Sequence, residues 1–339
     1  MRSRAARRLA SWDVAIVVVL AVFLAVASIT VDRFASARNV SFLLLDLAPI
    51  ALIALPMTLI IVTGEIDLSV ASTLGLTSAV LGALWDGGWP MEAIVPACLL
   101  LGAVLGALNG LFVTVLGLPS LAVTIGTLAL YRGLAFVVLG DRAVAQFPPG
   151  LTGWVSAGVP TLLLPLLALA LVFAVLLHAT PLGRRLFAAG ANVEAARFTG
   201  VRVAAVKFWL YVACGAVCAL AGVLWTLRYS SARADNGSGL ELAVVAAVLL
   251  GGVSIFGGRG TLWGVLAGVL LLTSLQNALR LLDVSTEALT LVTGLLLIVS
   301  VLAPNAVSAL GRRRRRPPSA PSVHPTASAP AEPPVVRSS

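Results

Sequence analysis

The sequence of 339 residues is poor in charge, and this scarcity decides its class. Asp, Glu, Lys and Arg make up only 11% of the residues, whereas hydrophobic residues make up 59%. A soluble domain carries about 25% charged residues, because its exterior must be wetted by water. No soluble fold could hide this much apolar surface. The sequence therefore predicts an all-α integral membrane protein whose apolar side chains face lipid.

Lysine, histidine and cysteine are also scarce. Lys207 is the only lysine, and it stands between Val206 and Phe208. A nucleotide-binding P-loop requires Gly-Lys-Ser or Gly-Lys-Thr, so this chain cannot carry one, and we expect no cofactor on it. The histidines and cysteines are isolated or lie in apolar runs, at Cys98, His178, Cys214, Cys218 and His324. They form no metal set and no catalytic cluster of the kind that a membrane enzyme would need.

Long apolar runs are abundant. About 20 apolar residues cross the roughly 30 Å of a bilayer's hydrocarbon core, and we expect about ten such transmembrane helices. They are predicted at Asp13–Ile29, Leu43–Val62, Leu68–Trp85, Ala93–Leu116, Ser120–Leu139, Pro160–Ala179, Phe208–Leu227, Glu241–Phe256, Thr261–Leu281 and Glu287–Ala303. If Leu68–Trp85 or Glu241–Phe256 is re-entrant, the count falls to eight or nine.

Positive charge gathers at the two ends of the chain. Four arginines precede the first apolar run, and Arg312 to Arg316 follow the last. Basic residues that flank membrane spans are retained in the cytoplasm, so both termini are predicted to be cytoplasmic. This placement accounts for the net charge of +9. No basic face with interleaved aromatic residues exists, so we expect no nucleic-acid binding.

These patterns divide the chain into three parts. Residues 1–12 form a basic cytoplasmic N-terminus, and residues 13–304 form the transmembrane domain with a long cytoplasmic loop at 180–207. Residues 305–339 form a basic and then Pro-, Ser- and Ala-rich tail with little to bury, and such segments stay disordered. The arginines of the tail can lie against the headgroups of anionic membrane lipid.

The loop at 180–207 contains its own helix signals. Asn192 is a favoured N-cap, Glu194 would complement the helix dipole in the first turn, and Gly200 is a natural C-terminal stop. About two helical turns fit between these caps. The sequence leaves two interpretations open. The helix is either an amphipathic connector on the headgroups or a rigid element that fits a cleft on a cytoplasmic partner.

Glycine marks further features. The stretch that begins at Gly64 (Gly-Glu-Ile-Asp-Leu-Ser-Val) and the one that begins at Gly257 (Gly-Gly-Arg-Gly-Thr-Leu-Trp) each join two apolar runs, which indicates a faint internal repeat of a kind found in transporters. Two stripes have a glycine at every fourth position and predict close approach of neighbouring helices. They are Gly102, Gly106 and Gly110, and Gly260, Gly264 and Gly268.

The loop resembles the coupling-helix region of ABC importer permeases. Its pattern Gly-x-Asn-x-x-Ala-Ala-x-x-x-Gly over residues 190–200 is similar to that of the ribose- and rhamnose-type sugar permeases. Stretches that begin at Gly64, Leu118 and Leu249 also resemble that family's signatures, in the same order. The resemblance covers residues 14–304. Tyr131-Arg132-Gly133 and the stretch 140–144 are most similar to the rhamnose and autoinducer branch.

The resemblance implies a set of partners. A permease of this family pairs with a second permease subunit, identical or related, and binds ABC ATPase subunits that carry the ATP and Mg. An extracytoplasmic sugar-binding protein delivers the sugar. The resemblance also implies that one group of residues couples the permease to the ATPase. These are Gly190, Asn192, Glu194, Ala195, Ala196, Arg197, Thr199 and Gly200.

A neutral sugar needs hydroxyl- and amide-bearing side chains along its path, because these can hydrogen-bond its hydroxyls. The candidates for the translocation path are Asp67, Asn109, Thr124, Thr127, Arg132, Gln276 and Asn277. Asp67 could equally cap the helix that follows it. Arg132 could snorkel outward, pair with an acid from another span or bind a sugar hydroxyl.

The sequence thus predicts the permease subunit of an ABC importer for a monosaccharide such as rhamnose or ribose, in the bacterial inner (plasma) membrane. The alternative is an ion-coupled secondary transporter, which needs embedded acids or a cation site at the bilayer midplane. The deep runs lack paired acids, which disfavours that alternative. A polytopic membrane enzyme is disfavoured by the absence of a clustered catalytic set.

Overall fold

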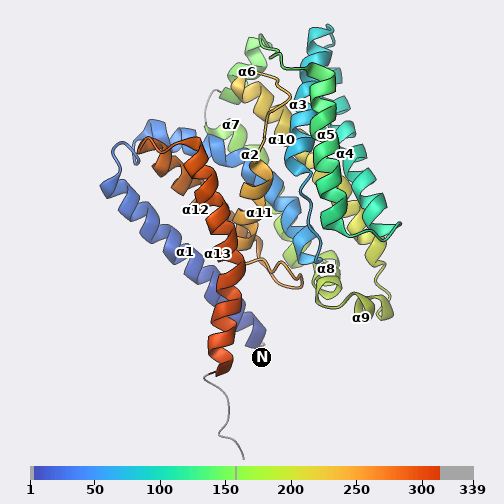
Figure 1. The fold of residues 1–339 in the computed structure, drawn as a ribbon, viewed down its shortest axis with the longest axis vertical. Helices are drawn as coiled ribbons and strands as arrows, with labels where there is room; N and C mark the ends of the chain where they lie inside the picture. The colour runs from blue at the N-terminus through green and yellow to red at the C-terminus, as the bar shows by residue number, and fades with distance from the viewer. Residues whose placement is uncertain (1–3, 157–158, 314–339) are drawn as a thin grey trace, which may run out of the picture. The chain divides into compact units, whose positions relative to one another are not determined.

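The structure is a computed structural model that describes residues 4–156 and 159–313 (Figure 1). Every regular element in these ranges is a helix, and one isolated β-bridge joins Val144 to Ala232. The predicted all-α class is confirmed. The chain forms two compact units, residues 1–302 and 303–339, and the arrangement described below is that of the first unit.

The helices follow the predicted apolar runs, with additional helices at residues 149–156 and 181–198. They are α1 (Arg4–Thr30), α2 (Ala37–Val62), α3 (Val70–Asp86), α4 (Met91–Thr114), α5 (Ser120–Leu139), α6 (Pro149–Ser156), α7 (Val159–Ala174), the π-helix η1 (Val175–Ala179), α8 (Pro181–Ala191), α9 (Val193–Phe198), α10 (Val203–Tyr229), α11 (Leu240–Leu250), α12 (Leu262–Leu281) and α13 (Thr286–Arg313).

Six helices of the described residues are long and apolar enough to cross a membrane, namely α1, α2, α4, α5, α10 and α12. The bent pair Leu163–Ala179 and Pro181–Ala191 would make a seventh span if it crosses as one. Three further apolar helices, α3, α11 and the Thr286–Leu302 part of α13, are shorter. The chain is therefore a multi-pass membrane protein, and the count of ten spans stays a prediction.

The helix α11 ends earlier than the sequence predicted. It stops at Leu250, where Gly251 and the positive-φ Gly252 end the helix. Its 11 residues rise about 16 Å, which is roughly half of the bilayer's hydrocarbon thickness. The predicted span Glu241–Phe256 is thus too long. The short helix agrees with the re-entrant alternative for this segment.

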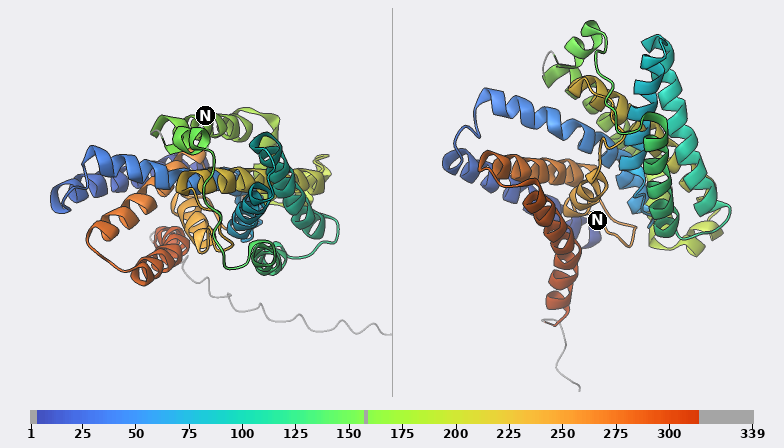
Figure 2. Two further views of the ribbon diagram at one scale, coloured as in Figure 1. Left: turned by 90° about the horizontal axis from the view of Figure 1, so that it is seen from above. Right: turned by 45° about the horizontal axis from the view of Figure 1, so that its top comes forward.

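The helix α2 is the centre of the first unit. In its most apolar stretch 83% of the residues are buried, against 11% for α1. It contacts α7, α10, α11 and α12, and Figure 2 shows these helices around it. Residues 47–62 are apolar on every side apart from Thr58, which allows other helices to pack around α2 on all sides.

The glycine stripe on α4 forms a close seam with α10. A Cβ at Gly102 or Gly106 would overlap the backbone carbonyl of Gly215 or of Tyr211. The second stripe brings Gly264 and Gly268 against the end of α11 in the same way. Both predicted close approaches are confirmed. Shape-matched backbone contact of this kind holds helices together in lipid.

The helices α8 and α9 lie at one end of the bundle, and α6 lies at the other (Figure 1). The last described helix, α13, continues to Arg313, past the predicted end of its span at residue 303. The predicted tail beyond residue 313 and the first three residues lie outside the described residues.

Candidate coupling and translocation sites

The short helix α9 has the predicted caps. The side-chain oxygen of Asn192 accepts a hydrogen bond from the amide of Ala195 at 2.9 Å. Glu194 lies in the first turn, and Gly200 has a φ of 83° just after the C-cap residue Thr199. A left-handed backbone conformation just after a helix C-cap favours glycine. The sequence signals therefore located α9 correctly.

The side chains of α9 divide into a buried and an exposed set. Ala196 is 3% exposed and packs with Ala189 of α8 and Val203 of α10. Glu194, Ala195, Arg197 and Thr199 are exposed, and Phe198 is 92% exposed. Ala196 therefore positions the helix, while the others are available to a partner. Phe198 was not predicted from the sequence as a functional residue. A helix of only six residues offers little surface to cover an aromatic side chain, and this signal could have identified it.

At the end of α8, the backbone of two other segments approaches Gly190 closely. A Cβ at Gly190 would overlap the carbonyl oxygen of Val62 and the amide of Gly258. That amide donates a hydrogen bond to the same Val62 oxygen at 2.8 Å. We call this contact between Gly190, Val62 and Gly258 the backbone junction. It joins the α8–α9 segment to the end of α2 and to the loop before α12, so the two glycine-marked stretches of the sequence meet at this point.

The break between α2 and α3 is organised by Asp67, which is 2% exposed. One carboxylate oxygen of Asp67 accepts from the amide and the hydroxyl of Ser69, at 2.9 and 2.6 Å. Ser69 is the N-cap residue of α3 and makes no side-chain cap of its own. Asp67 therefore shapes the turn into α3 from two residues before the cap, without being the N-cap itself. The side-chain amide of Asn109 on α4 donates to the Ser69 hydroxyl at 2.8 Å.

Three further contacts hold the same break. The Thr124 hydroxyl on α5 donates to the Ile66 carbonyl at 3.4 Å, and the Ser120 hydroxyl accepts from the Ile66 amide at 3.3 Å. The ammonium of Lys207 forms an ion pair with Glu65. Of the predicted path residues, Asp67, Asn109 and Thr124 are thus brought together, and the chain's only lysine ties them to the second turn of α10.

Thr127 lies one turn further along α5 and makes different contacts. Its hydroxyl donates to the carbonyls of Val123 and Thr124 in its own helix, at 3.1 and 3.4 Å. This is the usual bond of a threonine inside a membrane helix. The side chain is 5% exposed, so its hydroxyl is already paired within α5.

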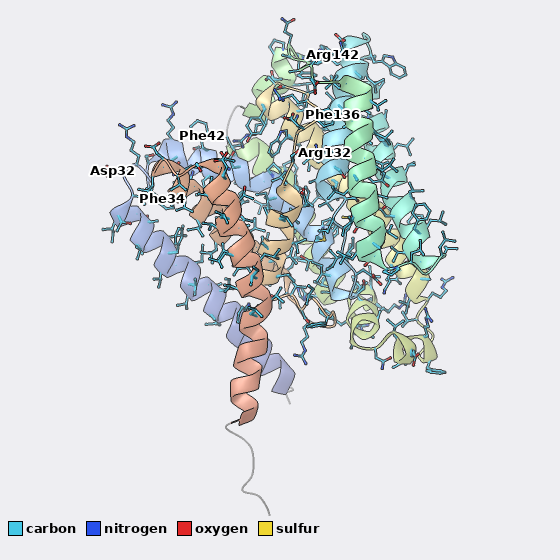
Figure 3. The ribbon with its side chains drawn as sticks, in the orientation of Figure 1. Asp32, Phe34, Phe42, Arg132, Phe136 and Arg142 are labelled. Atoms are coloured by element: carbon cyan, nitrogen blue, oxygen red, sulfur yellow. The ribbon has the colours of Figure 1, made fainter. Side chains whose placement is uncertain are left out.

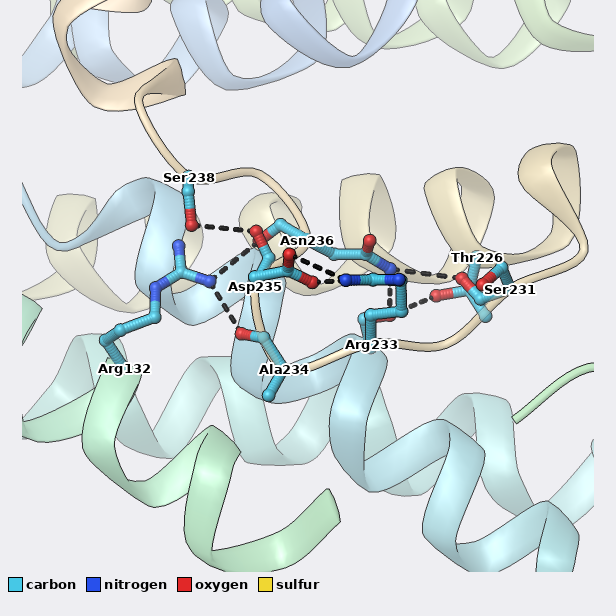
Figure 4. A network of polar contacts seen from close by, with 9 residues as sticks. Arg132, Thr226, Ser231, Arg233, Ala234, Asp235, Asn236 and Ser238 are labelled. Carbon is cyan, nitrogen blue, oxygen red and sulfur yellow. Dashed lines mark hydrogen bonds and ion pairs between the residues drawn. The ribbon is translucent and has the colours of Figure 1, made fainter. Parts of the chain in front are cut away.

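Arg132 lies part-way along α5 (Figure 3) and binds backbone carbonyls. One of its terminal nitrogens donates to the carbonyls of Ala234 and Asn236 at 2.7 and 2.9 Å, and the other donates to that of Ala71 at 3.3 Å. Figure 4 shows the guanidinium against the loop between α10 and α11. Among the described residues the guanidinium therefore binds backbone carbonyls and makes no ion pair with an acid, and its predicted contact with a sugar hydroxyl stays a prediction. Arg132 instead fastens that loop to α3 and α5.

The loop held by Arg132 has further polar contacts. The side-chain amide of Asn236 donates to the Ser78 hydroxyl on α3 at 2.8 Å. On the exposed side of the loop, Arg233 binds the Asp235 carboxylate at 2.8 and 3.0 Å (Figure 4). The hydrogen bond from this guanidinium lowers the pKa of Asp235. The pair is half-exposed, so it shapes the loop and contributes little to stability.

Gln276 and Asn277 lie on α12, apart from the α2–α3 break. Asn277 and Asn39 exchange two amide hydrogen bonds, at 2.8 and 3.0 Å, and Gln276 donates to Thr293 on α13 at 3.0 Å. Both line a small cavity with Asp46 of α2 and Trp225 of α10. Apart from Thr127, which bonds within α5, the predicted path residues therefore lie in three places, namely the α2–α3 break, the Arg132 contact and this cavity.

The chain matches a known protein family over residues 39–301. The family is described as the permease component of the branched-chain amino acid transport system. The chain belongs to this family of transport permeases. The match covers nearly all of the transmembrane helices.

Relatives of the chain are bacterial import permeases. It is 32% identical to the autoinducer 2 import system permease protein LsrD of Yersinia enterocolitica, over 86% of this chain and 91% of the relative. It is 34% identical to the ribose import permease protein RbsC of Haemophilus influenzae, over 85% and 91%. These matches confirm the predicted resemblance to sugar permeases of the ribose and autoinducer type. No solved structure matches the chain.

Proposed function

We propose that this chain is the membrane-spanning subunit of an ABC importer for a monosaccharide or a similarly small sugar-like solute. Its relatives named for ribose and autoinducer 2 support this substrate class. Rhamnose belongs to the same class of small sugars, and its transport stays a prediction. The chain would lie in the bacterial inner membrane with both termini in the cytoplasm. It would pair with a second permease subunit, identical or related, and receive its solute from an extracytoplasmic binding protein.

The observation that carries the proposal is the exposed face of α9. The helix is capped at both ends, Ala196 anchors it, and the Phe198 side chain is 92% exposed. An exposed aromatic side chain on a rigid support is a typical anchor for a protein partner. We assign this partner as an ABC ATPase, whose own chain would hold ATP and Mg. Glu194, Ala195, Arg197 and Thr199 would complete the docking surface.

The backbone junction supplies a route from the ATPase to the transmembrane helices. Movement of α9 would act through α8 on the end of α2 and on the loop before α12. The Glu65–Lys207 ion pair links the α2–α3 break to α10, which begins just after α9. Asp67, Asn109 and Thr124 surround that break, so a shift there would change the polar lining between α3, α4 and α5. In this proposal Gly190, Asn192 and Gly200 set the shape of the coupling segment.

The test separates docking from folding. Replacement of Phe198 by Asp puts a charge where an apolar anchor is needed, and truncation of a central interface aromatic typically costs 2 kcal/mol or more. We expect at least a roughly tenfold loss of ATPase co-purification and a matching loss of ATP-driven sugar uptake in membrane vesicles. Trp89→Ala, an exposed aromatic between α3 and α4, is the control and should retain the ATPase.

Two results would contradict the proposal. The first is full ATPase retention and uptake by the Phe198→Asp variant at normal expression. The second is uptake that persists in ATP-depleted vesicles while a proton or sodium gradient is maintained, which would favour the ion-coupled secondary transporter.

A further inference from the structure

Asp46 is an acid inside the central helix α2, and it binds two arginines. One of its oxygens accepts from Arg228 at 2.6 Å and from the Tyr229 hydroxyl at 3.1 Å. The other lies 3.5 Å from Arg280 of α12. An ionisable group within a membrane helix is costly and is a functional candidate by default. The backbone junction, Arg132 and the coupling segment do not use this cluster.

The cluster has a hydrogen-bond donor to spare. The side chain of Arg228 is only 9% exposed, and its Nη1 atom is buried without a partner in the described part of the chain. A buried donor left unpaired costs roughly 1–3 kcal/mol. The Arg228 guanidinium lies 5.0 Å from the centre of the Tyr229 ring, so Arg228 holds Asp46 and Tyr229 in place beside the cavity without lining it.

A cavity of about 80 Å³ lies beside this cluster. At roughly 10–15 Å³ of such space for each water, it holds several waters, which a small polar solute could displace. Its walls combine polar groups from Asp46, Gln276 and Arg280 with the rings of Trp225 and Tyr229, whose centres are 4.9 Å apart. An aromatic ring presents an apolar face beside a polar handle, and a few oriented polar groups in a mostly apolar pocket are typical of small-molecule sites.

We propose that this cavity is a binding site for a small polyhydroxylated solute, a deduction that rests on the proposed sugar-permease function. The apolar C–H face of the solute would lie on Trp225 and Tyr229. Its hydroxyls would donate to Asp46 and accept from Gln276 and Arg280. The site lies among the last turns of α10 and α12, at the opposite end of these helices from α8 and α9. In the proposed orientation it is the extracytoplasmic end, where a binding protein would release its cargo.

The first arm of the test establishes transport. The permease, its ATPase and its sugar-binding protein are reconstituted in liposomes, and ATP-driven uptake of D-ribose, L-rhamnose and autoinducer 2 is measured. Uptake of none of the three would contradict the proposed function and this site with it. Uptake of any one leads to the second arm, which tests the site alone.

The second arm compares two tryptophans of α10. Trp225→Leu removes a ring of the cavity, whereas the control Trp209→Leu removes a ring that is 66% exposed elsewhere on the same helix. We expect Trp225→Leu to lower uptake at saturating binding protein at least fivefold with the ATPase still bound, and Trp209→Leu to stay within twofold of wild type. Equal uptake by both variants would overturn the site and leave the proposed function intact.

A direct occupancy measurement covers the case in which Trp225→Leu does not assemble. Leu240 lines the cavity, and the native cysteines are buried, so Leu240→Cys gives one reporter for maleimide labelling. The transported sugar, at tens of millimolar and without binding protein, should slow this labelling at least threefold. It should leave the labelling of Trp89→Cys unchanged. No protection at Leu240→Cys would contradict the proposal.

Discussion

At the scale of single residues, Arg132 illustrates how a buried cation is satisfied by backbone. Its guanidinium offers several donors in a fixed plane, and the three carbonyls that it binds come from α3 and from the loop between α10 and α11. Gly75 leaves the space that the guanidinium and the Asn236 carbonyl occupy. Sequence could identify Arg132 as unusual but could not reveal these partners, because the carbonyls lie about 60 and 100 positions away along the chain.

Replacement of Arg132 by Leu should therefore destabilise the protein. The change leaves three carbonyls without their charged donor, and hydrogen bonds to a charged group contribute about 1.5–3 kcal/mol each, so we expect a loss of about 2 kcal/mol or more. Thermal unfolding in detergent, followed by size-exclusion chromatography, measures it. Arg142→Leu is the control, because Arg142 makes a half-exposed ion pair with Asp86 that should contribute at most about 1 kcal/mol. Equal midpoints for the two variants would contradict the structural role of Arg132.

At the scale of elements, the local sequence predicted the limits of α9 but did not predict the neighbouring helix α8. Asn192, Glu194 and Gly200 define a helix by neighbouring contacts, so its limits could be found without tertiary information. The preceding helix α8 was not predicted as a separate element. Its N-cap Thr180 and its Pro181 are ordinary start signals, but they directly follow an apolar run that hides them. The contact between α8 and α2 joins residues more than 100 positions apart in the sequence, and no local sequence pattern predicts it.

Gly190 gives the prediction that belongs to this scale. Gly190→Val would force the end of α8 away from Val62 and Gly258, because the added side chain overlaps backbone that cannot rotate aside. We expect ATP-driven uptake to fall at least tenfold while α9 still binds the ATPase. ATPase co-purification and vesicle uptake, measured in parallel, separate the two effects. Gly126→Val on α5, where an added Cβ meets nothing within 4 Å, should leave uptake within twofold. Normal uptake by Gly190→Val would exclude the junction as the coupling route.

At the scale of the whole molecule, composition alone was enough to predict a multi-pass helical protein. Hydropathy located the helices because each apolar run must satisfy its backbone within itself in lipid. It could not tell a full span from a partial one, because α11 is as apolar as the spans but stops after 11 residues. Nor could it show that α2, rather than α1, lies at the centre, although α2 is apolar on nearly every side.

Orientation is the prediction to test at this scale. Because Cys98, Cys214 and Cys218 are buried, wild-type protein should react little with a membrane-impermeant maleimide. Ser238→Cys, in the loop between α10 and α11, should be labelled in intact spheroplasts. Arg197→Cys on α9 should be labelled only after the membrane is permeabilised. The opposite pattern would place α9 outside the cytoplasm and would rule out an ATPase partner there.

The backbone junction also limits how this protein can be re-engineered. Its three segments meet main chain to main chain, so no exchange of side chains can adapt one of them to a foreign neighbour. A chimera that takes the 180–207 loop from another permease would therefore have to take the matching stretches at the end of α2 and before α12 as well. Segments in such close backbone contact can be transferred to another permease only together.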